Sequence, residues 1–405
     1  MPPERSGSAA PCARPPAPSG SSSRRAARSS TTFPTAFATV PRCARRTSSF
    51  PSDSSTSTPA PTDHPSMLRS KFTGVGSFVP PNVVTNQDLE DPLEITARSI
   101  ERRTGILQRH WNDDPTVATS DLAFEASRKA LAMAGLDKSE LDMIVFATLS
   151  PDAAAPGSGC FLQRKLDLPG IPTVDIRQQC SGFLYGLSVA DLYIRSGQCK
   201  HILLVGAEMQ SKLLDMTPRG RKVTTLFGDG AGAVILSATE VADDSDDSSE
   251  SFVLSTHLHS DGCRLDHLIW QHPGTMNETF LEMDLFDDPA SHPQMLGREL
   301  YDICLEVLPA VSHEALSAHG KTASDVDLFV IHQTNMRMNR EYAELMGVPM
   351  DKVFSTVQDF GNTTAATVPI GLAEAVRQGR LEPGMLVLSC TFGSGLSWGS
   401  ALYRW

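Results

Sequence analysis

The chain has 405 residues, 40% of them hydrophobic and 20% charged, so it can bury a large core and is not disordered throughout. Its longest apolar runs, such as HILLVGA at residues 201–207, have the length of strands and fall well short of the roughly 20 residues that cross a bilayer. We therefore expect a soluble protein. The formal net charge of −12 argues against a nucleic-acid partner, because binding to phosphate backbones needs clustered Lys and Arg.

Residues 1–66 differ from the rest of the chain. They contain eight Arg, no Lys and three acidic residues among dense Ser, Pro, Ala and Thr, a net charge of +5 that leaves −17 for residues 67–405. Because this segment lacks the apolar side chains that would offset its ordering entropy, we predict a disordered leader. It is either an organellar transit peptide or a mis-called start upstream of Met67, and in the second case we expect a cytoplasmic protein.

Three segments of the first half of the chain recur, in the same order, in the second half. Residues 139–152 match 324–337, residues 180–197 match 362–379, and residues 201–209 match 385–393, at offsets of 185, 182 and 184. Each half reads helix, strand, helix, strand, with strands that are apolar on both faces. The repeat predicts an α/β protein of two pseudo-symmetric halves, residues 67–242 and 243–405.

Such a repeat would bring two helix starts together. Cys180 and Asn362 hold matching positions in it, so both side chains would face one site, which His332 would reach from the end of the strand LFVI. At a helix start, the partial positive charge of unpaired backbone N–H groups predicts a lowered pKa for the Cys180 thiol. Each residue alone has a plainer structural reading, as a buried Cys, a core His or an N-cap Asn, so the case rests on the three together.

Two other kinds of site are not supported. The eight Cys form no CxxC pair and no His/Cys cluster at metal spacing, so we expect no metal ion. The run GDGAGA at residues 228–233 lacks the Gly-Lys-Ser/Thr ending of a phosphate loop and the spaced acids of a calcium loop. We interpret its glycines as permitting close backbone approach.

Several motifs together are recognisable. In chain order they are GVGSFVPPNVVTNQDL, ERRTGILQRH, DIRQQCSGFLYGL, LFGDGAGAVILSA, IHQTNMRMN, FGNTTAATVP and FGSGLSWGSALYRW. From about Phe72 to the C-terminus the sequence resembles the 3-ketoacyl-acyl-carrier-protein synthase III branch of the thiolase-fold condensing enzymes. The resemblance implies a thiolase-like fold with αβαβα layers and an acyltransferase of fatty acid biosynthesis that needs no cofactor beyond its thioester substrates.

The resemblance also implies roles for particular residues. Cys180 would be acylated by a thioester, and His332 and Asn362 would then stabilise the enolate formed when a malonyl thioester loses carbon dioxide. A protonated imidazole would pair with the malonyl carboxylate and hinder its departure, so we expect His332 to be neutral. The oxyanion of the condensation step would lie between the backbone N–H groups of Cys180 and Ser394.

Further residues would hold the substrate and the partners. By resemblance, Arg103 and Thr104 would lie beside coenzyme A phosphates, Asn335 along the pantetheine chain, and Arg337 where an acyl carrier protein docks. Ser99 replaces a Trp that relatives stack on adenine, although the facing Arg221 is kept. Ala155 replaces a bulky aromatic of short-chain-primed relatives, which predicts a primer longer or bulkier than acetyl. Family members are homodimers whose partner subunit helps to build the acyl tunnel, so we expect one here.

Other functions remain open at this stage. The same three side chains would serve a non-decarboxylative condensation of two acyl thioesters, or a starter-unit acyltransferase of secondary metabolism. A hydrolase is less suitable, because hydrolysis needs no enolate site and this chain keeps both His332 and Asn362. A catalytically inactive binding partner would be expected to lack the nucleophile.

Overall fold

The computed structural model describes residues 67–241, 250–277, 280 and 291–405. The predicted leader over residues 1–66 and the predicted boundary between the halves at residues 242 and 243 therefore lie outside the described residues. No helix in the described part of the chain has both the length and the apolar character needed to span a membrane.

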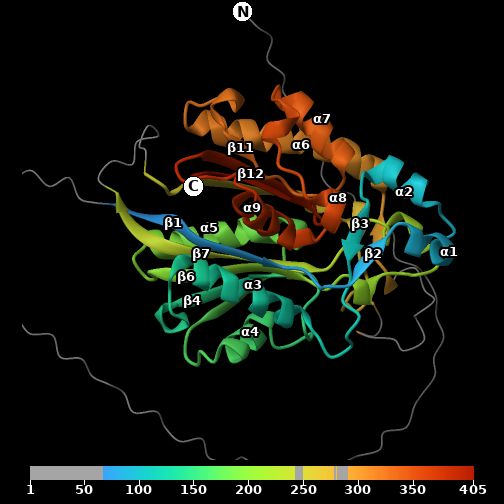
Figure 1. The fold of residues 1–405 in the computed structure, drawn as a ribbon, viewed down its shortest axis with the longest axis horizontal. Helices are drawn as coiled ribbons and strands as arrows, with labels where there is room; N and C mark the ends of the chain where they lie inside the picture. The colour runs from blue at the N-terminus through green and yellow to red at the C-terminus, as the bar shows by residue number, and fades with distance from the viewer. Residues whose placement is uncertain (1–66, 242–249, 278–279, 281–290) are drawn as a thin grey trace, which may run out of the picture. The chain divides into compact units, whose positions relative to one another are not determined.

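The first half forms a mixed five-stranded sheet in the order β1-β7-β6-β4-β5 (Figure 1). Its strands are β1 (Met67–Phe78), β4 (Met143–Ala147), β5 (Thr173–Ile176), β6 (His201–Glu208) and β7 (Gly230–Val241). Strand β4, between β6 and β5, runs parallel to both of them, whereas β7 is antiparallel to both β6 and β1. All five residues of β4 are buried, as expected for a strand covered by helices on both faces.

The second half repeats this sheet in the order β11-β12-β13-β8. Its strands are β8 (Val253–Ser260), β11 (Leu328–Phe329), β12 (Leu386–Gly393) and β13 (Ser397–Arg404). Strand β11 is parallel to β12, and β13 is antiparallel to both β12 and β8, which is the pairing of β4, β6, β7 and β1. A parallel bridge from Phe329 to Val353 takes the place of β5. The repeat predicted from the sequence is confirmed in the order and direction of the strands.

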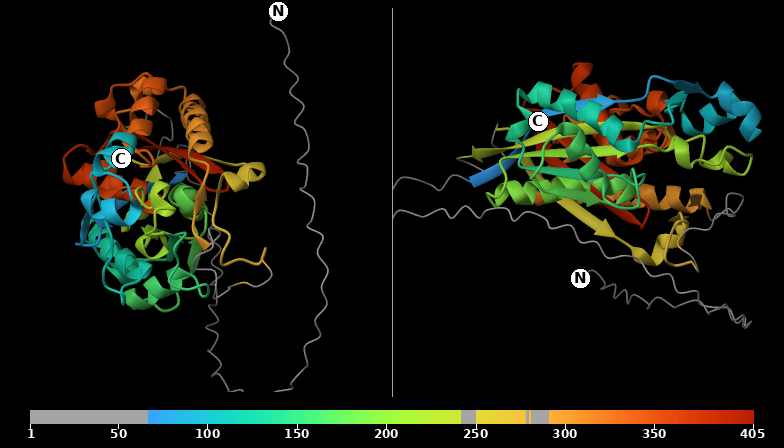
Figure 2. Two further views of the ribbon diagram at one scale, coloured as in Figure 1. Left: turned by 90° about the vertical axis from the view of Figure 1, so that its right-hand side faces the viewer. Right: turned by 90° about the horizontal axis from the view of Figure 1, so that it is seen from below.

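Six helices cover the two sheets and complete five layers in the order αβαβα. The outer pairs are α3 (Thr119–Ala134) with α4 (Ser158–Leu166) and α6 (Gly297–Ala318) with α7 (Met336–Met346), and the central pair is α5 (Gly182–Arg195) with α9 (Thr367–Arg377). Three apolar cores separate the layers, and the central one joins side chains of α5 and α9 to both sheets. The left view of Figure 2 places the orange helices of the second half opposite the teal and green helices of the first.

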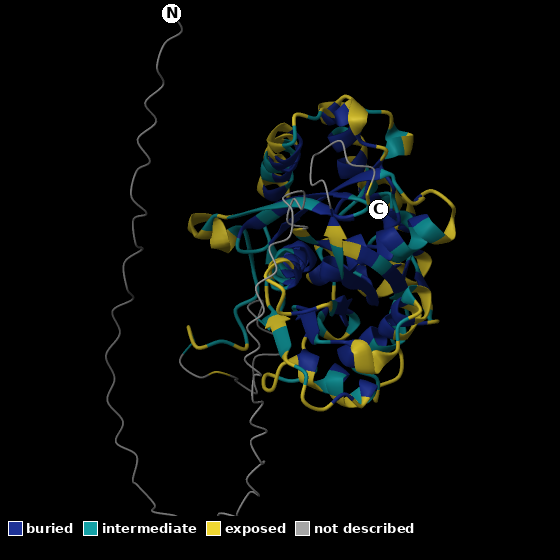
Figure 3. Cartoon of the chain, turned by 90° about the vertical axis from the view of Figure 1, so that its left-hand side faces the viewer, coloured by how far each residue is buried: buried dark blue, intermediate teal, exposed yellow. Residues whose placement is uncertain are grey.

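The remaining elements are short. They are β2 (Val83–Thr85), α1 (Glu90–Leu93), α2 (Ala97–Thr104), β3 (Gln108–His110), β9 (Leu268–Ile269), β10 (Gln294–Met295), α8 (Val357–Phe360) and several 3-10 helices, of which η3 (Gln179–Ser181) and η10 (Thr364–Ala366) matter for the site. Each of these two leads directly into one helix of the central pair. Figure 3 shows the buried residues concentrated in the sheets and in the central layer between them.

Glycines let the central layer press onto the first sheet. A Cβ on Gly206 of β6 would lie 2.4 Å from the carbonyl oxygen of Ala365, and one on Gly232 of β7 would lie 2.6 Å from the backbone nitrogen of Ile370. Both distances are shorter than any side chain tolerates, so only glycine fits there. The structural interpretation of the GDGAGA run is confirmed, because its glycines allow the backbones to approach closely.

Candidate active site

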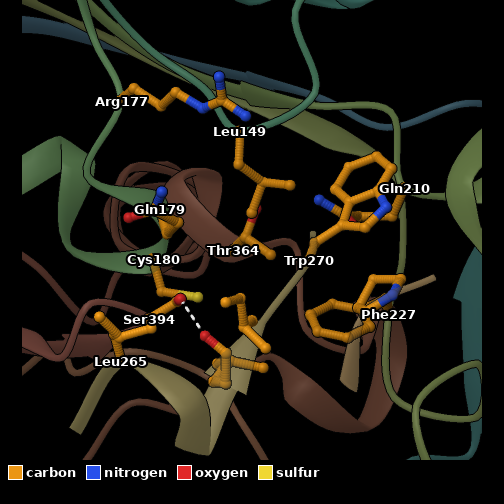
Figure 4. A pocket seen from close by; sticks show the side chains of 13 residues that line it. Leu149, Arg177, Gln179, Cys180, Gln210, Phe227, Leu265, Trp270, Thr364 and Ser394 are labelled. Carbon is orange, nitrogen blue, oxygen red and sulfur yellow. Dashed lines mark hydrogen bonds between the residues drawn. The ribbon is translucent and has the colours of Figure 1, made fainter. Parts of the chain in front are cut away.

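Cys180 lies in η3, between strand β5 and helix α5, and lines a cavity of about 240 Å³. The side chains around the thiol are mainly apolar and include Leu149, Phe227, Leu265 and Trp270 (Figure 4). Ser394 borders the same cavity from the second half of the chain, and its hydroxyl donates a hydrogen bond to the carbonyl of Leu268. The cavity therefore suits an apolar acyl group attached to the sulfur.

Strand β12 of the second half ends directly against the segment that carries Cys180. A Cβ on Gly393 would lie 3.0 Å from the backbone nitrogen of Cys180 and 3.2 Å from its Cβ. The Ser181 hydroxyl also donates a 3.0 Å hydrogen bond to the carbonyl of Ser397. The backbone after β12, which includes Ser394, is thus held beside the backbone of Cys180, as the predicted pair of oxyanion donors requires.

The prediction of a lowered pKa for Cys180 is wrong for the protein without substrate. Burial raises the pKa of this thiol to about 12, and the nearby carboxylate of Glu208 raises it further, while a backbone hydrogen bond acts in the opposite direction. The side chain is 7% exposed, so desolvation of the thiolate outweighs the local field of the helix start. The resting thiol is protonated, and the reaction needs a group that accepts its proton.

His332 follows β11, and hydrogen bonds fix both its backbone and its ring. Its backbone N–H donates a 2.8 Å hydrogen bond to the carbonyl of Cys390, and its Nδ1 lies 2.7 Å from Oγ1 of Thr367, the first residue of α9. Burial lowers the pKa of the imidazole to about 3. The ring is therefore neutral at physiological pH, as expected from the sequence.

Gln333 fixes the loop that carries His332. Its Nε2 donates to the carbonyls of Ile331 and Phe354 at 2.8 and 3.1 Å. Its Oε1 accepts from Nδ2 of Asn339 at 3.0 Å and from the backbone N–H of Thr356 at 3.1 Å. This buried amide is used in full, which explains the Gln of the His-Gln-x-Asn segment as a structural residue.

Asn362 lies just before η10, and one end of its amide is fixed. Its Oδ1 accepts a 2.8 Å hydrogen bond from the backbone N–H of Thr364, so the oxygen is used. Its Nδ2 donates to no residue that the structure describes and remains for another partner. Thr364 lines the same cavity as Cys180, whereas His332 and Asn362 are not among its lining residues. Within the described part of the chain, no hydrogen bond joins the side chains of Cys180, His332 and Asn362.

The predicted equivalence of Cys180 and Asn362 is not exact. Strands β6 and β12 begin 185 residues apart, at His201 and Leu386, and so do η3 and η10. At that offset Cys180 corresponds to Ala365, and Asn362 lies three residues earlier than the sequence match placed it. The 182-residue match holds for the ends of α5 and α9, because the helix that follows η10 is three residues shorter.

Comparison with known proteins decides the family. Residues 174–262 match the family model for 3-oxoacyl-[acyl-carrier-protein] synthase III, and residues 316–405 match the model for its C-terminal part. A β-ketoacyl-[acyl-carrier-protein] synthase III of Rhodospirillum rubrum is 44% identical over 339 residues, which cover 84% of this chain and 100% of the relative. The chain belongs to the 3-oxoacyl-[acyl-carrier-protein] synthase III family.

Solved structures of synthase III proteins share the fold. The 3-oxoacyl-[acyl-carrier-protein] synthase III of Aquifex aeolicus is 34% identical, with a TM-score of 0.74 over 83% of this chain and 100% of that one. The priming β-ketosynthase of the R1128 polyketide pathway is 29% identical, also at a TM-score of 0.74, over 85% and 99% of the two chains. The expected thiolase-like fold is confirmed, and the protein is a condensing acyltransferase of the synthase III type.

The substrate-arm residues inferred from the synthase III motifs do not line the cavity of Cys180. Arg103 is exposed in the last turn of α2, whereas Thr104 is buried and its hydroxyl donates to the carbonyl of Ile100 at 2.8 Å. Asn335 caps α7 by accepting from the backbone N–H of Met338 at 2.8 Å. A surface cavity of about 560 Å³ lies between α2 and α7, and its lining includes four arginines: Arg98, Arg102, Arg337 and Arg340.

Three other inferred positions do not line either the cavity of Cys180 or the basic surface cavity. Arg221 is exposed in a 3-10 helix over residues 220–222, and Ser99 is half-buried in α2. Ala155 is exposed and does not line the cavity of Cys180. Its neighbours Ala153 and Ala154 instead border a second cavity of about 600 Å³, which shares Leu149, Arg177 and Trp270 with the cavity of Cys180.

Glu208 is a residue near the site that the sequence did not single out. It ends strand β6 and is fully buried, and its carboxylate accepts from Oγ of Ser150 at 2.6 Å and from the backbone N–H of Leu149 at 3.2 Å. Burial raises its pKa to about 7 in spite of these hydrogen bonds. The acid at the end of the apolar run HILLVGAE was the available signal.

Replacing Glu208 with Gln is expected to change how stability depends on pH. Because the pKa of Glu208 is raised to about 7, the folded protein keeps a proton that the unfolded chain releases at about 4.5, so the unfolding free energy falls as pH rises between these values. Glu208→Gln removes this contribution. Between pH 5 and 8, the unfolding free energy of the wild type should therefore fall by about 1–3 kcal/mol more than that of the variant. Urea unfolding at each pH measures it.

The matched control is Glu382→Gln, which removes an exposed carboxylate from a loop and should leave the pH dependence as in the wild type. A constant stability difference between wild type and Glu208→Gln from pH 5 to 8 would show that Glu208 does not titrate in this range.

Proposed function

We propose that the protein joins an acyl group to a malonyl thioester by decarboxylative condensation, with Cys180 as nucleophile and His332 and Asn362 as donors to the enolate. The observation that carries this is the Cys180 thiol in an apolar cavity bordered by Ser394 and Thr364, together with a neutral, buried imidazole that contacts Thr367, three residues after Thr364. In the first half-reaction the Cys180 sulfur attacks an acyl thioester, and the donor thiol leaves.

In the second half-reaction the malonyl carboxylate leaves as carbon dioxide, and the electron pair of the broken bond forms an enolate. The free Nδ2 of Asn362 and the neutral His332 suit an oxygen that gains charge in this step, because neither attracts the carboxylate that must leave. The enolate carbon then attacks the acyl group on Cys180, and the backbone N–H groups of Cys180 and Ser394 hold the resulting oxyanion.

The acyl donor and the carrier would approach over the basic surface cavity between α2 and α7. Its arginines suit the phosphates of a coenzyme A or phosphopantetheine arm, and an acidic acyl carrier protein would dock there through Arg337. Arg103, Thr104, Asn335 and Arg221 are the proposed contacts of the arm. We place the reaction in the cytoplasm, unless residues 1–66 direct the protein to an organelle.

The test of the function uses purified protein with malonyl-acyl carrier protein and acetyl, hexanoyl or dodecanoyl thioesters of both coenzyme A and carrier protein. Mass spectrometry reads the product and the acylated Cys180 peptide. A 3-ketoacyl thioester with release of carbon dioxide supports the proposal, and the best donor shows whether the primer is longer than acetyl. Condensation of two acyl thioesters without malonate, or transfer of the acyl group without a new carbon–carbon bond, would contradict it.

We expect the protein to be a homodimer. In the single chain the second cavity is open beside exposed residues 154–157, so a neighbouring subunit could close this end of an acyl tunnel. Sedimentation at micromolar concentration should give twice the mass of the chain. A fully active monomer under the same conditions would refute the prediction.

A further inference from the structure

The hydroxyl of Thr367 lies between two groups that compete for its single proton. Thr367 begins α9 and is 1% exposed, and its Oγ1 lies 2.7 Å from Nδ1 of His332 and 2.9 Å from the carbonyl oxygen of Thr364. A carbonyl can only accept, so in this arrangement the hydroxyl donates to Thr364. The oxygen of Thr367 then accepts from His332.

This geometry fixes the tautomer of the resting imidazole. If Nδ1 donates to Thr367, the neutral His332 carries its proton on Nδ1, and Nε2 has a free lone pair. Nε2 makes no hydrogen bond to any residue in the described part of the chain. The nitrogen left for the substrate is therefore an acceptor, not the donor that stabilises an enolate.

The two half-reactions of the proposed function need opposite properties of Nε2. The protonated Cys180 thiol requires an acceptor when the sulfur attacks, and Nε2 with a free lone pair supplies it. The enolate requires a donor, which Nε2 can be only after it gains a proton. A group that sets the tautomer of His332 can therefore make Nε2 of the same ring an acceptor in acylation and a donor in decarboxylation.

We propose that Thr367 is a positioning residue whose hydroxyl turns between the Thr364 carbonyl and His332 Nδ1, and so makes Nε2 an acceptor for acylation and a donor for decarboxylation. The inference rests on the proposed function. The turn leaves no buried acceptor without a partner, because the Thr364 carbonyl also accepts from the backbone N–H of Thr367. This second hydrogen bond keeps the free-energy difference between the two orientations of the Thr367 hydroxyl small.

The protons balance in both steps. During acylation the Cys180 proton moves toward Nε2 as the new carbon–sulfur bond forms, and it ends on the donor thiolate as the old thioester carbon–sulfur bond breaks. The ring then gives its Nδ1 proton to solvent and takes one from solvent at Nε2, so it stays neutral while Thr367 donates to Nδ1. After decarboxylation and attack by the enolate carbon, the released Cys180 thiolate takes one proton from water.

The first test compares Thr367→Val, which keeps the shape without the hydroxyl, with Thr367→Ser, which keeps the hydroxyl. Acylation of Cys180 is followed by single-turnover mass spectrometry, and malonyl decarboxylation is followed in a Cys180→Gln background. We expect Val to slow both half-reactions about 10–100-fold and Ser to restore them to within about 3-fold, since small misplacements of a catalytic group have effects of this size.

The control for general loss of stability is Ser312→Ala. Ser312 lies in α6, and its buried hydroxyl also has two hydrogen bonds, to the Leu308 carbonyl at 2.7 Å and to the Tyr342 hydroxyl at 2.8 Å. Removing it should lower stability as much as Thr367→Val does but leave both half-reactions unchanged. Equal loss of activity in the two variants would make the effect of Thr367 merely structural and overturn the proposal.

The second test reads the tautomer directly by NMR of protein labelled with ¹⁵N-histidine, with His332 assigned by its absence in His332→Gln. We expect the proton on Nδ1 in the free protein and on Nε2 in Cys180→Gln, whose amide stands in for the acyl thioester. In Thr367→Val this change should be lost, and in Thr367→Ser it should be kept. The same tautomer in the free and Cys180→Gln proteins would overturn the proposal, even if Thr367→Val did not fold.

The two proposals fail in different ways. If the protein does not condense thioesters but its His332 tautomer follows the Thr367 hydroxyl as described, the proposed function is wrong and the geometry is right. If condensation occurs while Thr367→Val keeps wild-type rates in both half-reactions, only the role of Thr367 is wrong.

Discussion

Cys180→Ala is expected to abolish acyl transfer, with a loss of at least about 10³-fold, because Cys180 is the only thiol among the described residues that line the cavity. The unfolding free energy should change by no more than about 1–2 kcal/mol, since one buried sulfur atom is lost from a site that already borders a cavity. Acylation is measured by mass spectrometry of the Cys180 peptide, and stability by urea unfolding.

The matched control is Cys199→Ala. Cys199 is also a free thiol and is also 7% exposed, but it lies before β6 and belongs to the central apolar core. The control should keep full activity. Condensation at the wild-type rate by Cys180→Ala, or loss of activity in Cys199→Ala with an intact fold, would end the assignment of the nucleophile.

The second large effect concerns the donors to the enolate. In a Cys180→Gln background, Asn362→Ala and His332→Ala should each slow malonyl decarboxylation about 10²–10³-fold, the usual result of removing one such donor. Asn362→Asp is the sharper variant, because it keeps the oxygen that accepts from Thr364 and replaces the free Nδ2 by an acceptor. It should be slower than Asn362→Ala, since a carboxylate repels the enolate oxygen.

Release of carbon dioxide from malonyl-carrier protein measures these rates, and heat denaturation checks that each variant is folded. Asn86→Asp is a suitable comparison, because Asn86 is also a buried amide, and its Nδ2 donates to the Ile106 carbonyl rather than to a residue of the site. If Asn362→Asp decarboxylates as fast as its parent, Asn362 does not contact the enolate and the assignment fails.

Much of the fold could be predicted from the sequence, for a physical reason. Strands such as β4 and β6 are covered on both faces, so their residues form continuous apolar runs that are visible in the sequence, and the repeat shows that the same unit occurs twice. The exact correspondence of the central helices was not visible in the sequence. Helix α9 is three residues shorter than α5, so aligning the ends of the two helices places Asn362 opposite Cys180, whereas aligning their starts does not.

The structure differs from the sequence prediction in the electrostatics of the candidate site. The local sequence at Cys180 showed a helix start. The residues that bury the thiol, such as Leu149 and those of β12, and the carboxylate of Glu208 that also raises its pKa are distant in the chain. Ala155 was matched to a position in a loop, and loops do not preserve register. Thr367 gave no signal at all, because a Thr in the first turn of a helix is common and its partner His332 is 35 residues away.

One backbone detail links the two halves of the site. Gln179, at the start of η3, has φ of 46°, and Thr364, at the start of η10, has φ of 49°. Side chains other than glycine avoid this left-handed region at a cost of about 1–2 kcal/mol, yet both positions carry one. The same left-handed turn therefore precedes both helices of the central layer. The proposed nucleophile follows one turn and the proposed enolate donor precedes the other, so a repeated frame would hold an asymmetric reaction.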